Sequence, residues 1–321
     1  MRVAVLSGGR SSEHEVSLRS GASVAEGLRG GGHEVVEVLI GRDGRWSHGE
    51  GELHLVPAGG LLEADVAFPA LHGPFGEDGS VQGLLECLDV PYVGSDVLAS
   101  AVCMDKLTLK RLLALHGIPQ VDFLQAGEDR WRERAERMGL PLWVKPSRLG
   151  SSVGISKVTR SGDLEEAAAL AARHDPRVIV EASAGGKEVE CSVLGNDDIE
   201  TSPPGEIEAH ADWYDYEAKY SEGGMELIVP ARIDEAAALR VRELAARSFR
   251  LAGCSGLARC DFFVEEDGTV LVNEINTMPG FTETSVYAKL LGAAGIGYAE
   301  LCDRLVALAV ERHRTAHSYE F

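Results

Sequence analysis

Residues 257–280 decide the fold: Leu-Ala-Arg-Cys-Asp-Phe-Phe-Val-Glu-Glu-Asp-Gly-Thr-Val-Leu-Val-Asn-Glu-Ile-Asn-Thr-Met-Pro-Gly. They read as two strands joined by the Asp-Gly at 267–268, a favoured two-residue hairpin turn. The cross-strand pairs expected from that turn are Asp261 with Glu274 and Arg259 with Asn276. Because side chains alternate between the faces of a strand, all four side chains share one face.

This pairing predicts a local excess of negative charge. Like charges directly opposite each other destabilise a sheet, so a partner should neutralise Asp261 and Glu274. Two carboxylates and the Asn276 amide form an all-oxygen ligand set that suits a hard divalent cation such as Mg²⁺. The alternative is an exposed polar face on which Arg259 supplies the counter-charge.

The composition around this hairpin is that of a globular protein. The chain has 321 residues, of which 45% are hydrophobic and 26% charged, enough for two or three domains. Its net charge is −20, and no basic run is present. Broad nucleic-acid binding is therefore excluded, because it depends on cations that neutralise phosphates.

The cysteines and the apolar segments predict a cytoplasmic location. The six cysteines contain no Cys-x-x-Cys pair, and no Cys/His cluster has the spacing of a zinc site. Dispersed thiols fit a reducing cytoplasm. The chain begins directly with a strand pattern rather than a signal peptide, and no apolar stretch reaches the ~18–20 residues that span a bilayer.

Residues 1–95 alternate strand and helix patterns and predict an open α/β domain. A capping-box spacing between Ser12 and Glu15 predicts a helix that continues over 16–28. Ligands of such domains bind beyond the carboxyl ends of strands, where the loops at 8–13 and 72–79 lie. The strands are expected at Arg2–Leu6, Glu34–Ile40 and Asp65–Ala70.

The rest of the chain is expected to form two further domains, 96–181 and 182–321. Helices are predicted at 105–116, 163–173, 235–251 and 298–312, with strands at 142–145 and 178–181. The small residues at 182–186 resemble a hinge. Residues 201–224 are polar and rich in aromatic side chains, which predicts a lid over a site or, alternatively, a plain surface loop.

A possible phosphate site follows the strand at 142–145. The run from Lys145 to Gly154 offers small residues whose backbone N–H groups can approach an anion, and Lys145 adds a charge. It is not a P-loop sequence, and an ordinary turn is the alternative. Gly8-Gly9 lacks the full dinucleotide fingerprint, which argues against a dehydrogenase. Glu13 is either a helix-capping residue or a site residue, and His72 either a surface or a site residue.

Taken together, these motifs resemble one family. The chain carries, in order, Gly-Gly-x-Ser-x-Glu-x-Glu-Val-Ser, His-Gly-x-x-Gly-Glu-Asp-Gly-x-x-Gln-Gly, Met-Asp-Lys, Val-Lys-Pro-Ser-x-x-Gly-Ser-Ser-Val-Gly, Tyr-Asp-Tyr-Glu-Ala-Lys-Tyr, Arg-x-Asp and Asn-Glu-Ile-Asn-Thr-Met-Pro-Gly-Phe-Thr. This set closely resembles the D-alanine–D-alanine ligases, cytoplasmic ATP-grasp enzymes of peptidoglycan synthesis, usually homodimers. The resemblance runs from Gly8 to about Leu290.

The resemblance implies a three-domain ATP-grasp fold and a role for each matching residue. The implied catalytic residues are Glu13, Ser151, Tyr220 and Arg259. The implied substrate-binding residues are His72, Gly280, Ser285 and Val286. The implied ATP-binding residues are Lys106, Lys145, Glu181, Ala184, Glu188 and Lys219. Asp261, Glu274 and Asn276 would hold two Mg²⁺ ions, for which Mn²⁺ can substitute.

Two positions depart from the family pattern. Ala182 stands where many relatives carry a charged residue beside the adenine, and Val286 stands where leucine is common. The nearest rival functions are D-alanine–D-lactate and D-alanine–D-serine ligases of the same fold, and Tyr220 argues against D-lactate. A regulatory protein without catalysis would be expected to lack some of the metal-site residues, which are all present.

Overall fold

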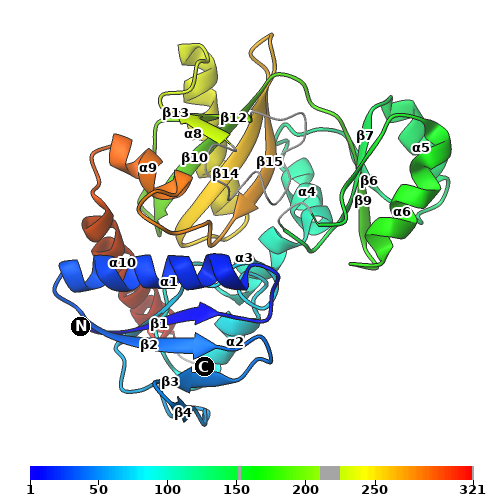
Figure 1. The fold of residues 1–321 in the computed structure, drawn as a ribbon. Coiled ribbons are helices and arrows are strands. Elements are labelled where there is room, and N and C mark those ends of the chain that lie inside the picture. The colour runs from blue at the N-terminus through cyan, green and yellow to red at the C-terminus, as the bar shows by residue number, and fades with distance from the viewer. Residues whose placement is uncertain (151–152, 210–224, 320–321) are drawn as a thin grey trace.

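The computed structural model describes residues 1–150, 153–209 and 225–319, and three sheets organise them (Figure 1). One sheet lies in the N-terminal part, one in the central part and one in the C-terminal part of the chain. The mixed α/β architecture expected from the sequence is therefore confirmed. No described helix combines the length and apolar character needed to cross a membrane.

The N-terminal sheet has the strand order β4-β3-β2-β1-β5. Its parallel core is formed by the apolar strand β1 between β2 and β5, as an open α/β fold requires. The bounds are β1 Arg2–Gly8, β2 Glu34–Ile40, β3 Trp46–His48, β4 Gly51–Glu52 and β5 Val66–Pro69, with helices α1 His14–Gly30 and α2 Ser80–Leu88.

The first helix begins differently from the prediction. The N-cap of α1 is Glu13, and its side chain makes no capping hydrogen bond. The capping box expected from Ser12 and Glu15 is therefore wrong. The backbone N–H of Glu13 instead donates to the Ser11 hydroxyl (3.2 Å), so the loop itself shapes the start of the helix.

The central sheet has the strand order β6-β9-β7-β8. Its elements are β6 Phe123–Gln125, β7 Leu142–Pro146, β8 Ser156–Val158, β9 Val178–Ala182, α5 Trp131–Met138, the short 3₁₀ helix Ser161–Asp163 and α6 Leu164–Ala172. Helices α3 Val97–Met104 and α4 Lys106–Leu115 lead into it from the first sheet. Asp105 ends α3 and caps α4, because its side chain accepts the Thr108 N–H.

The C-terminal sheet runs β13-β12-β10-β14-β15, with β11 also paired to β10. Its strands are β10 Lys187–Gly195, β11 Ile199–Thr201, β12 Gly205–Ala209, β13 Met225–Ile228, β14 Gly256–Val264 and β15 Val270–Asn276; its helices are α8 Glu235–Leu251, α9 Val286–Ala293 and α10 Tyr298–Ala316. The segment predicted as a lid, 201–224, therefore contains the last residue of β11 and the whole of strand β12. Residues 210–224 lie outside the described part of the chain.

The hairpin of β14 and β15 corrects one prediction and confirms another. The loop has three residues, because Glu265 N–H donates to Thr269 O (2.9 Å) and Gly268 adopts φ 84°. That geometry is a type I turn followed by a left-handed glycine, not the two-residue turn expected. A bulge after Asp261 then shifts the register back by one residue. The cross-strand pairs predicted at the site are consequently correct.

A shared core joins the first and last parts of the chain. Val5 and Phe68 of the N-terminal sheet belong to the same buried cluster as Phe281, Tyr287 and Leu305. Helix α10 therefore returns to the N-terminal sheet, as Figure 1 also shows. This packing brings the loops after β1 and β5 close to the end of β15, where the charged residues of the hairpin lie.

Candidate active site

The residues predicted on the hairpin form one cluster. Asp261 lies opposite Glu274, and Arg259 lies opposite Asn276. The Arg259 guanidinium donates two hydrogen bonds to Asp261, with Nε–Oδ1 and Nη2–Oδ2 distances both 2.7 Å. Asn276 Nδ2 also donates to Asp261 Oδ2 (3.0 Å). The site thus holds a fixed arginine beside a set of hard oxygen donors.

A further acid, Glu190, completes the surroundings of Arg259. Glu190 lies opposite Asp261 across β10 and β14, and its Oε2 is 2.9 Å from Arg259 Nε. Burial lowers the pKa of Arg259, but Asp261 and Glu190 outweigh burial and hold that pKa well above its ordinary range. The sequence analysis missed Glu190, although its two-residue spacing from Glu188 places both on one face of β10.

Three lysines and two glutamates form a second cluster. Lys106 Nζ lies 3.4 Å from Glu274 Oε2 and donates to Leu149 O (3.1 Å). Lys145 pairs with the buried Glu181, and Lys110 Nζ lies 3.0 Å from the other oxygen of that carboxylate. Lys110 was not predicted, but it follows Lys106 by four residues, so both project from the same face of α4.

The pKa shifts show how this cluster stays charged. Burial would raise the pKa of Glu181, but the two ammonium groups of Lys110 and Lys145 lower it to about 2. Burial opposes the charge of Lys145, yet Glu181 prevails and raises the pKa of this lysine. For Lys110 burial prevails and lowers the pKa. A buried carboxylate therefore stays ionised between two lysines.

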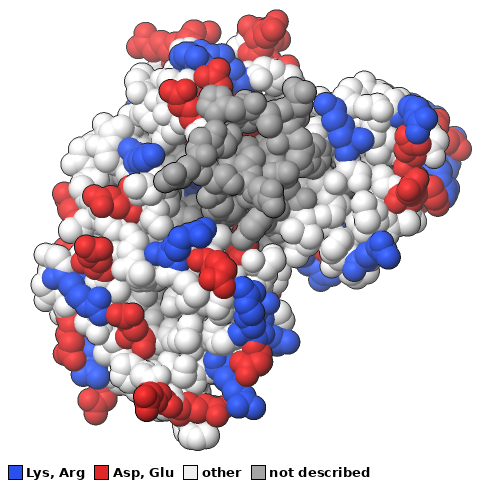
Figure 2. Space-filling view, in the orientation of Figure 1, with Lys and Arg blue, Asp and Glu red and all other residues white. Residues whose placement is uncertain are grey.

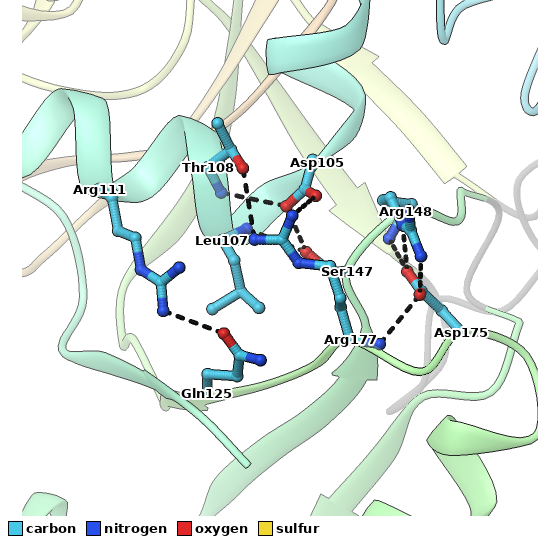
Figure 3. A network of polar contacts seen from close by, with 9 residues as sticks. All are labelled: Asp105, Leu107, Thr108, Arg111, Gln125, Ser147, Arg148, Asp175 and Arg177. Carbon is cyan, nitrogen blue, oxygen red and sulfur yellow. Dashed lines mark hydrogen bonds and ion pairs between the residues drawn. The ribbon is translucent and has the colours of Figure 1, made fainter. Parts of the chain in front are cut away.

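The network in Figure 3 joins the start of α4 to the segment that follows β7. Asp105 accepts hydrogen bonds from Thr108 N–H (3.1 Å) and Ser147 Oγ (2.8 Å), and Arg177 Nη1 lies 2.7 Å from its second oxygen. Lys106 N–H donates to Ser147 O (3.0 Å). The start of α4, which carries Lys106, is thereby tied to the segment that follows Lys145.

A second pair in the same figure holds the next part of the loop. Arg148 Nη2 lies 2.6 Å from Asp175 Oδ1, and the Arg148 N–H donates to Asp175 Oδ2 (2.8 Å). Burial raises the pKa of Asp175, but the Arg148 and Arg177 donors outweigh burial, so the net shift is downward. These contacts hold Arg148, at the start of the glycine/serine loop, in one position.

On the N-terminal side of the cleft, Glu13 is buried within the loops. A Cβ on Gly73 would lie 2.5 Å from Glu13 Oε2, and Gly73 has φ 72°, so only glycine fits there. A Cβ on Gly150 would lie 3.8 Å from the same oxygen. The glycine/serine loop therefore reaches the Glu13 carboxylate from across the cleft.

His72 is buried in the site rather than exposed on the surface. Its Nδ1 lies 3.0 Å from Met278 O, and its Nε2 lies 2.8 Å from Ser20 Oγ. Burial lowers the pKa of His72 more than the neighbouring Glu13 raises it. His72 thus connects α1 with the segment that follows β15, in a form that disfavours the charged imidazolium.

Glu77 is a further acid that the sequence analysis did not single out. Its carboxylate accepts the Gly73 N–H (2.6 Å) and the Met278 N–H (3.2 Å). Burial and the nearby Glu13 raise the pKa of Glu77 to about 8, although the two N–H donors lower it. The sequence signal was the motif around His72, which includes Glu77 but does not indicate its burial.

Several of these groups line one cleft of about 510 Å³. The N-terminal part contributes Glu13 and His72, the hairpin contributes Arg259 and Glu274, and α4 contributes Lys106. Ser285 is the N-cap of α9, and its hydroxyl accepts the Thr282 N–H (2.7 Å). The predicted residues that line this cleft are Glu13, His72, Lys106, Arg259, Glu274, Asn276, Gly280, Ser285 and Val286.

The predicted hinge lies at the base of the lysine cluster. Ala184 is half-buried in the turn between β9 and β10, and Glu188 is exposed on β10. Gly185 N–H donates to Glu265 Oε1 (3.0 Å) at the tip of the hairpin. A Cβ on Gly186 (φ 73°) would lie 2.0 Å from Val264 O, so the close approach requires glycine.

Three predicted residues cannot be placed. Ser151, Lys219 and Tyr220 lie outside the described residues. The proposed lid aromatics lie there too. Among the described side chains on the face in Figure 2, basic and acidic groups are interspersed.

The donor set fits Mg²⁺ on chemical grounds. Asp261 and Glu274 supply carboxylate oxygens, and Asn276 keeps its carbonyl oxygen as a donor because its nitrogen is the atom that contacts Asp261. No thiol or imidazole belongs to this trio, which argues for a hard ion rather than zinc. The ammonium and guanidinium groups beside it suit anionic phosphate oxygens.

Comparison with known proteins finds ligases among the proteins similar to this chain. The sequence matches the family "D-ala D-ala ligase N-terminus" over residues 2–60 and 56–95 and the family "D-ala D-ala ligase C-terminus" over residues 112–307. It is 49% identical to the D-alanine–D-alanine ligase of Deinococcus radiodurans, covering 97% of this chain and 98% of that protein. It is 42% identical to the D-alanine–D-alanine ligase of Geobacillus thermodenitrificans, covering 98% of this chain and 96% of that protein.

Solved structures agree with these matches. The D-alanine-D-alanine ligase from Coxiella burnetii superposes with a TM-score of 0.88 at 34% identity, covering 99% of this chain and 96% of that chain. The VanG D-Ala:D-Ser ligase of Enterococcus faecalis superposes with a TM-score of 0.86 at 35% identity, covering 96% and 99%. The ATP-grasp fold expected from the motifs is confirmed.

Proposed function

The chain belongs to the D-alanine–D-alanine ligase family, and we propose on that basis how its residues join two D-alanines. The reaction is an ATP-dependent ligation that yields D-alanyl-D-alanine, ADP and phosphate for peptidoglycan synthesis. The observation that carries this proposal is the cleft in which Arg259, Glu274 and Asn276 of the hairpin meet Lys106 and the Glu13–His72 region.

The chemistry proceeds in two steps. The carboxylate of the first D-alanine attacks the γ-phosphate of ATP and forms an acyl phosphate. The amine of the second D-alanine then attacks the acyl carbon and displaces phosphate. Because negative charge spreads over the transferred phosphoryl group, positioning and electrostatic stabilisation supply most of the catalysis.

Arg259 is the residue proposed to stabilise that developing charge. Asp261 and Glu190 hold its guanidinium in place and keep it ionised. Asp261, Glu274 and Asn276 would hold Mg²⁺, or Mn²⁺ in its place, and the bound ions would neutralise phosphate oxygens. Their arrangement beside Arg259 supports this assignment.

Lys106 and Lys145 are proposed to contact the phosphates of ATP. The hydrogen-bond network of Asp105 and Ser147 holds both lysines at fixed positions, which supports a binding role. Glu181 and Ala184 would contact the adenine and Glu188 the ribose, because they flank the hinge. Lys219 would lie on the phosphate side of the lid.

The amino-acid substrates are proposed to bind on the opposite side of the cleft. Glu13 would accept the ammonium of the first D-alanine, and His72 would support that end of the cleft. Gly280, Ser285 and Val286 would contact the second D-alanine, since all three line the cleft, Gly280 from the segment after β15 and the other two from the start of α9. Ser151 and Tyr220 would complete a hydrogen-bond set with Glu13 and exclude water from the acyl phosphate.

We further propose that the chain works in the cytoplasm as a homodimer with domains 1–95, 96–181 and 182–321. The proposed lid lies within about 201–224. A D-alanine–D-serine or D-alanine–D-lactate ligase is the alternative, which the similarity to a D-Ala:D-Ser ligase structure keeps open. The curated relatives favour D-alanine as the second substrate.

The test is phosphate release from ATP in four mixtures: D-alanine alone, L-alanine alone, D-alanine with D-serine, and D-alanine with D-lactate. We expect release with D-alanine alone, together with formation of D-alanyl-D-alanine. Release that occurs only with D-alanine plus D-serine or D-lactate would instead support the alternative function, a D-alanine–D-serine or D-alanine–D-lactate ligase. Absence of phosphate release under all four conditions would contradict the ligase assignment.

A further inference from the structure

Outside the cleft, two helix ends meet at three potential metal ligands, Asp89, His313 and His317. Asp89 follows the last residue of α2 and adopts a left-handed conformation (φ 59°, ψ 48°). His313 lies in the last turn of α10, and His317 is its C-cap. The two histidines are four residues apart, so their rings lie on one face of the helix.

The ligand atoms are close enough to share one ion. His317 Nε2 lies 3.1 Å from Asp89 Oδ1, and His313 Nε2 lies 3.7 Å from the same oxygen. All three ligand atoms lie within 4.8 Å of one another. Ligands on a tetrahedral ion with bonds of about 2.0 Å are about 3.3 Å apart, so the observed separations need only small side-chain adjustments.

The surroundings favour the metal-binding form of the histidines. His317 Nδ1 lies 2.9 Å from His313 O, so an N–H at Nδ1 leaves the Nε2 lone pair directed towards Asp89. Burial and the neighbouring His317 lower the pKa of His313, despite the acids Asp89 and Glu86.

Both helices also end at this point, which adds to the attraction for a cation. The carboxyl end of a helix carries a partial negative charge, and α2 and α10 each present that end here. Arg312 is the nearby opposing charge, but its guanidinium packs 4.2 Å over the Tyr92 ring and donates to Tyr92 O (3.0 Å). Glu86 accepts the Tyr92 hydroxyl (2.7 Å).

We propose that Asp89, His313 and His317 bind a borderline divalent ion such as Zn²⁺, with water in the remaining position. Two imidazoles and one carboxylate suit this class of ion, whereas the all-oxygen trio at the hairpin suits Mg²⁺. The bound ion would tie the end of α10 to the end of α2. Spacing along the sequence did not indicate this cluster, because Asp89 is distant in sequence from the two histidines.

Calorimetric titration of the tag-free full-length chain with Zn²⁺, in excess Mg²⁺, tests this site. We expect one saturable Zn²⁺ site whose dissociation constant rises about tenfold or more in His313→Ala/His317→Ala. The matched control His54→Ala/His116→Ala removes two exposed histidines elsewhere and should bind as the parent does. Cys87→Ser, which removes the exposed cysteine of α2, should also leave binding unchanged.

Co²⁺ provides a second readout that identifies the ligands. The parent should show the intense visible absorption of a low-coordinate Co²⁺ site, and Asp89→Asn should weaken that absorption. Zn²⁺ should also raise the melting temperature of the parent but not of His317→Ala. Equal Zn²⁺ affinity in the parent and the double-histidine variant, or loss of binding in the Cys87→Ser variant alone, would overturn the proposal.

Discussion

Two glutamates, one on each side of the cleft, have pKa values that are shifted in opposite directions. On the nucleotide side, Glu181 is buried between Lys110 and Lys145, and pairing lowers its pKa to about 2. On the substrate side, Glu77 is held by backbone N–H groups near Glu13, and its pKa rises to about 8. Pairing with cations thus preserves charge, whereas burial beside another acid favours the neutral form.

The difference matches what each side is proposed to bind. ATP brings several negative charges, so permanently charged lysines and Arg259 suit the nucleotide side. D-alanine is a zwitterion, which needs a few directed contacts rather than a strong field. A protonated Glu77 leaves the negative charge of that region on Glu13, where the substrate ammonium is proposed to bind.

Lys110→Met, on the nucleotide side, is expected to have the largest effect on stability. This change leaves the buried Glu181 with one ammonium partner, so we expect a loss of about 3–5 kcal/mol in the free energy of unfolding. Urea denaturation measures it. The matched control is Arg111→Ala, whose partner pairs are exposed and should contribute at most about 1 kcal/mol. Similar losses for both variants would contradict the role of buried pairing.

Glu274→Gln tests the point where the lysine cluster meets the hairpin. The substitution keeps the shape but removes the charge that faces Lys106 and the proposed metal site. We expect kcat to fall by about 10²–10³ with little change in melting temperature, because an electrostatic contribution to the transition state is lost. Steady-state rates over a range of Mg²⁺ concentrations measure this. Near-normal turnover at limiting Mg²⁺ would refute the metal assignment.

Lys145→Ala sharpens the comparison by separating the two substrates. A charged hydrogen bond contributes about 1.5–3 kcal/mol, so ATP affinity should fall about 10- to 100-fold. D-alanine affinity should stay nearly unchanged, because Lys145 belongs to the nucleotide side. Calorimetry with each ligand measures both. Lys157→Ala, a lysine on the neighbouring strand β8, is the control.

The sequence predicted the hairpin side of the site better than the substrate side. Strand alternation and a near-correct register placed Asp261 opposite Glu274, even though the loop length was wrong and a bulge compensated for it. Ser285 and His72 were found through motif resemblance rather than through periodicity.

What the sequence could not give depends on burial and on contacts between distant segments. In the sequence, Glu190 and Lys110 are ordinary charged positions. Their partners come from other elements: Glu190 lies opposite Asp261 of β14, and Lys110 pairs with Glu181 of β9. The shifted pKa of Glu77 depends on the approach of Met278, about two hundred residues away along the chain. Neither effect has a local signature, because burial is set by the packing of the N-terminal loops against the end of β15.

The pH dependence of stability gives the finest test of the substrate side. The folded pKa of Glu77 is about 8, above its ordinary value, so the folded state holds a proton that the unfolded chain releases. That contribution is complete below the unfolded pKa of about 4.5 and is lost as the pH rises through about 8. His72 acts in the opposite direction, since its folded pKa is lowered and its contribution is lost as the pH falls below about 6.5. Glu77→Gln should therefore flatten the decline in unfolding free energy between pH 6 and 8.5 and leave the stability profile at lower pH unchanged. Urea denaturation at a series of pH values measures this. An unchanged alkaline slope in Glu77→Gln would show that Glu77 is ionised in the folded state, and the contrast between the two sides of the cleft would then fail.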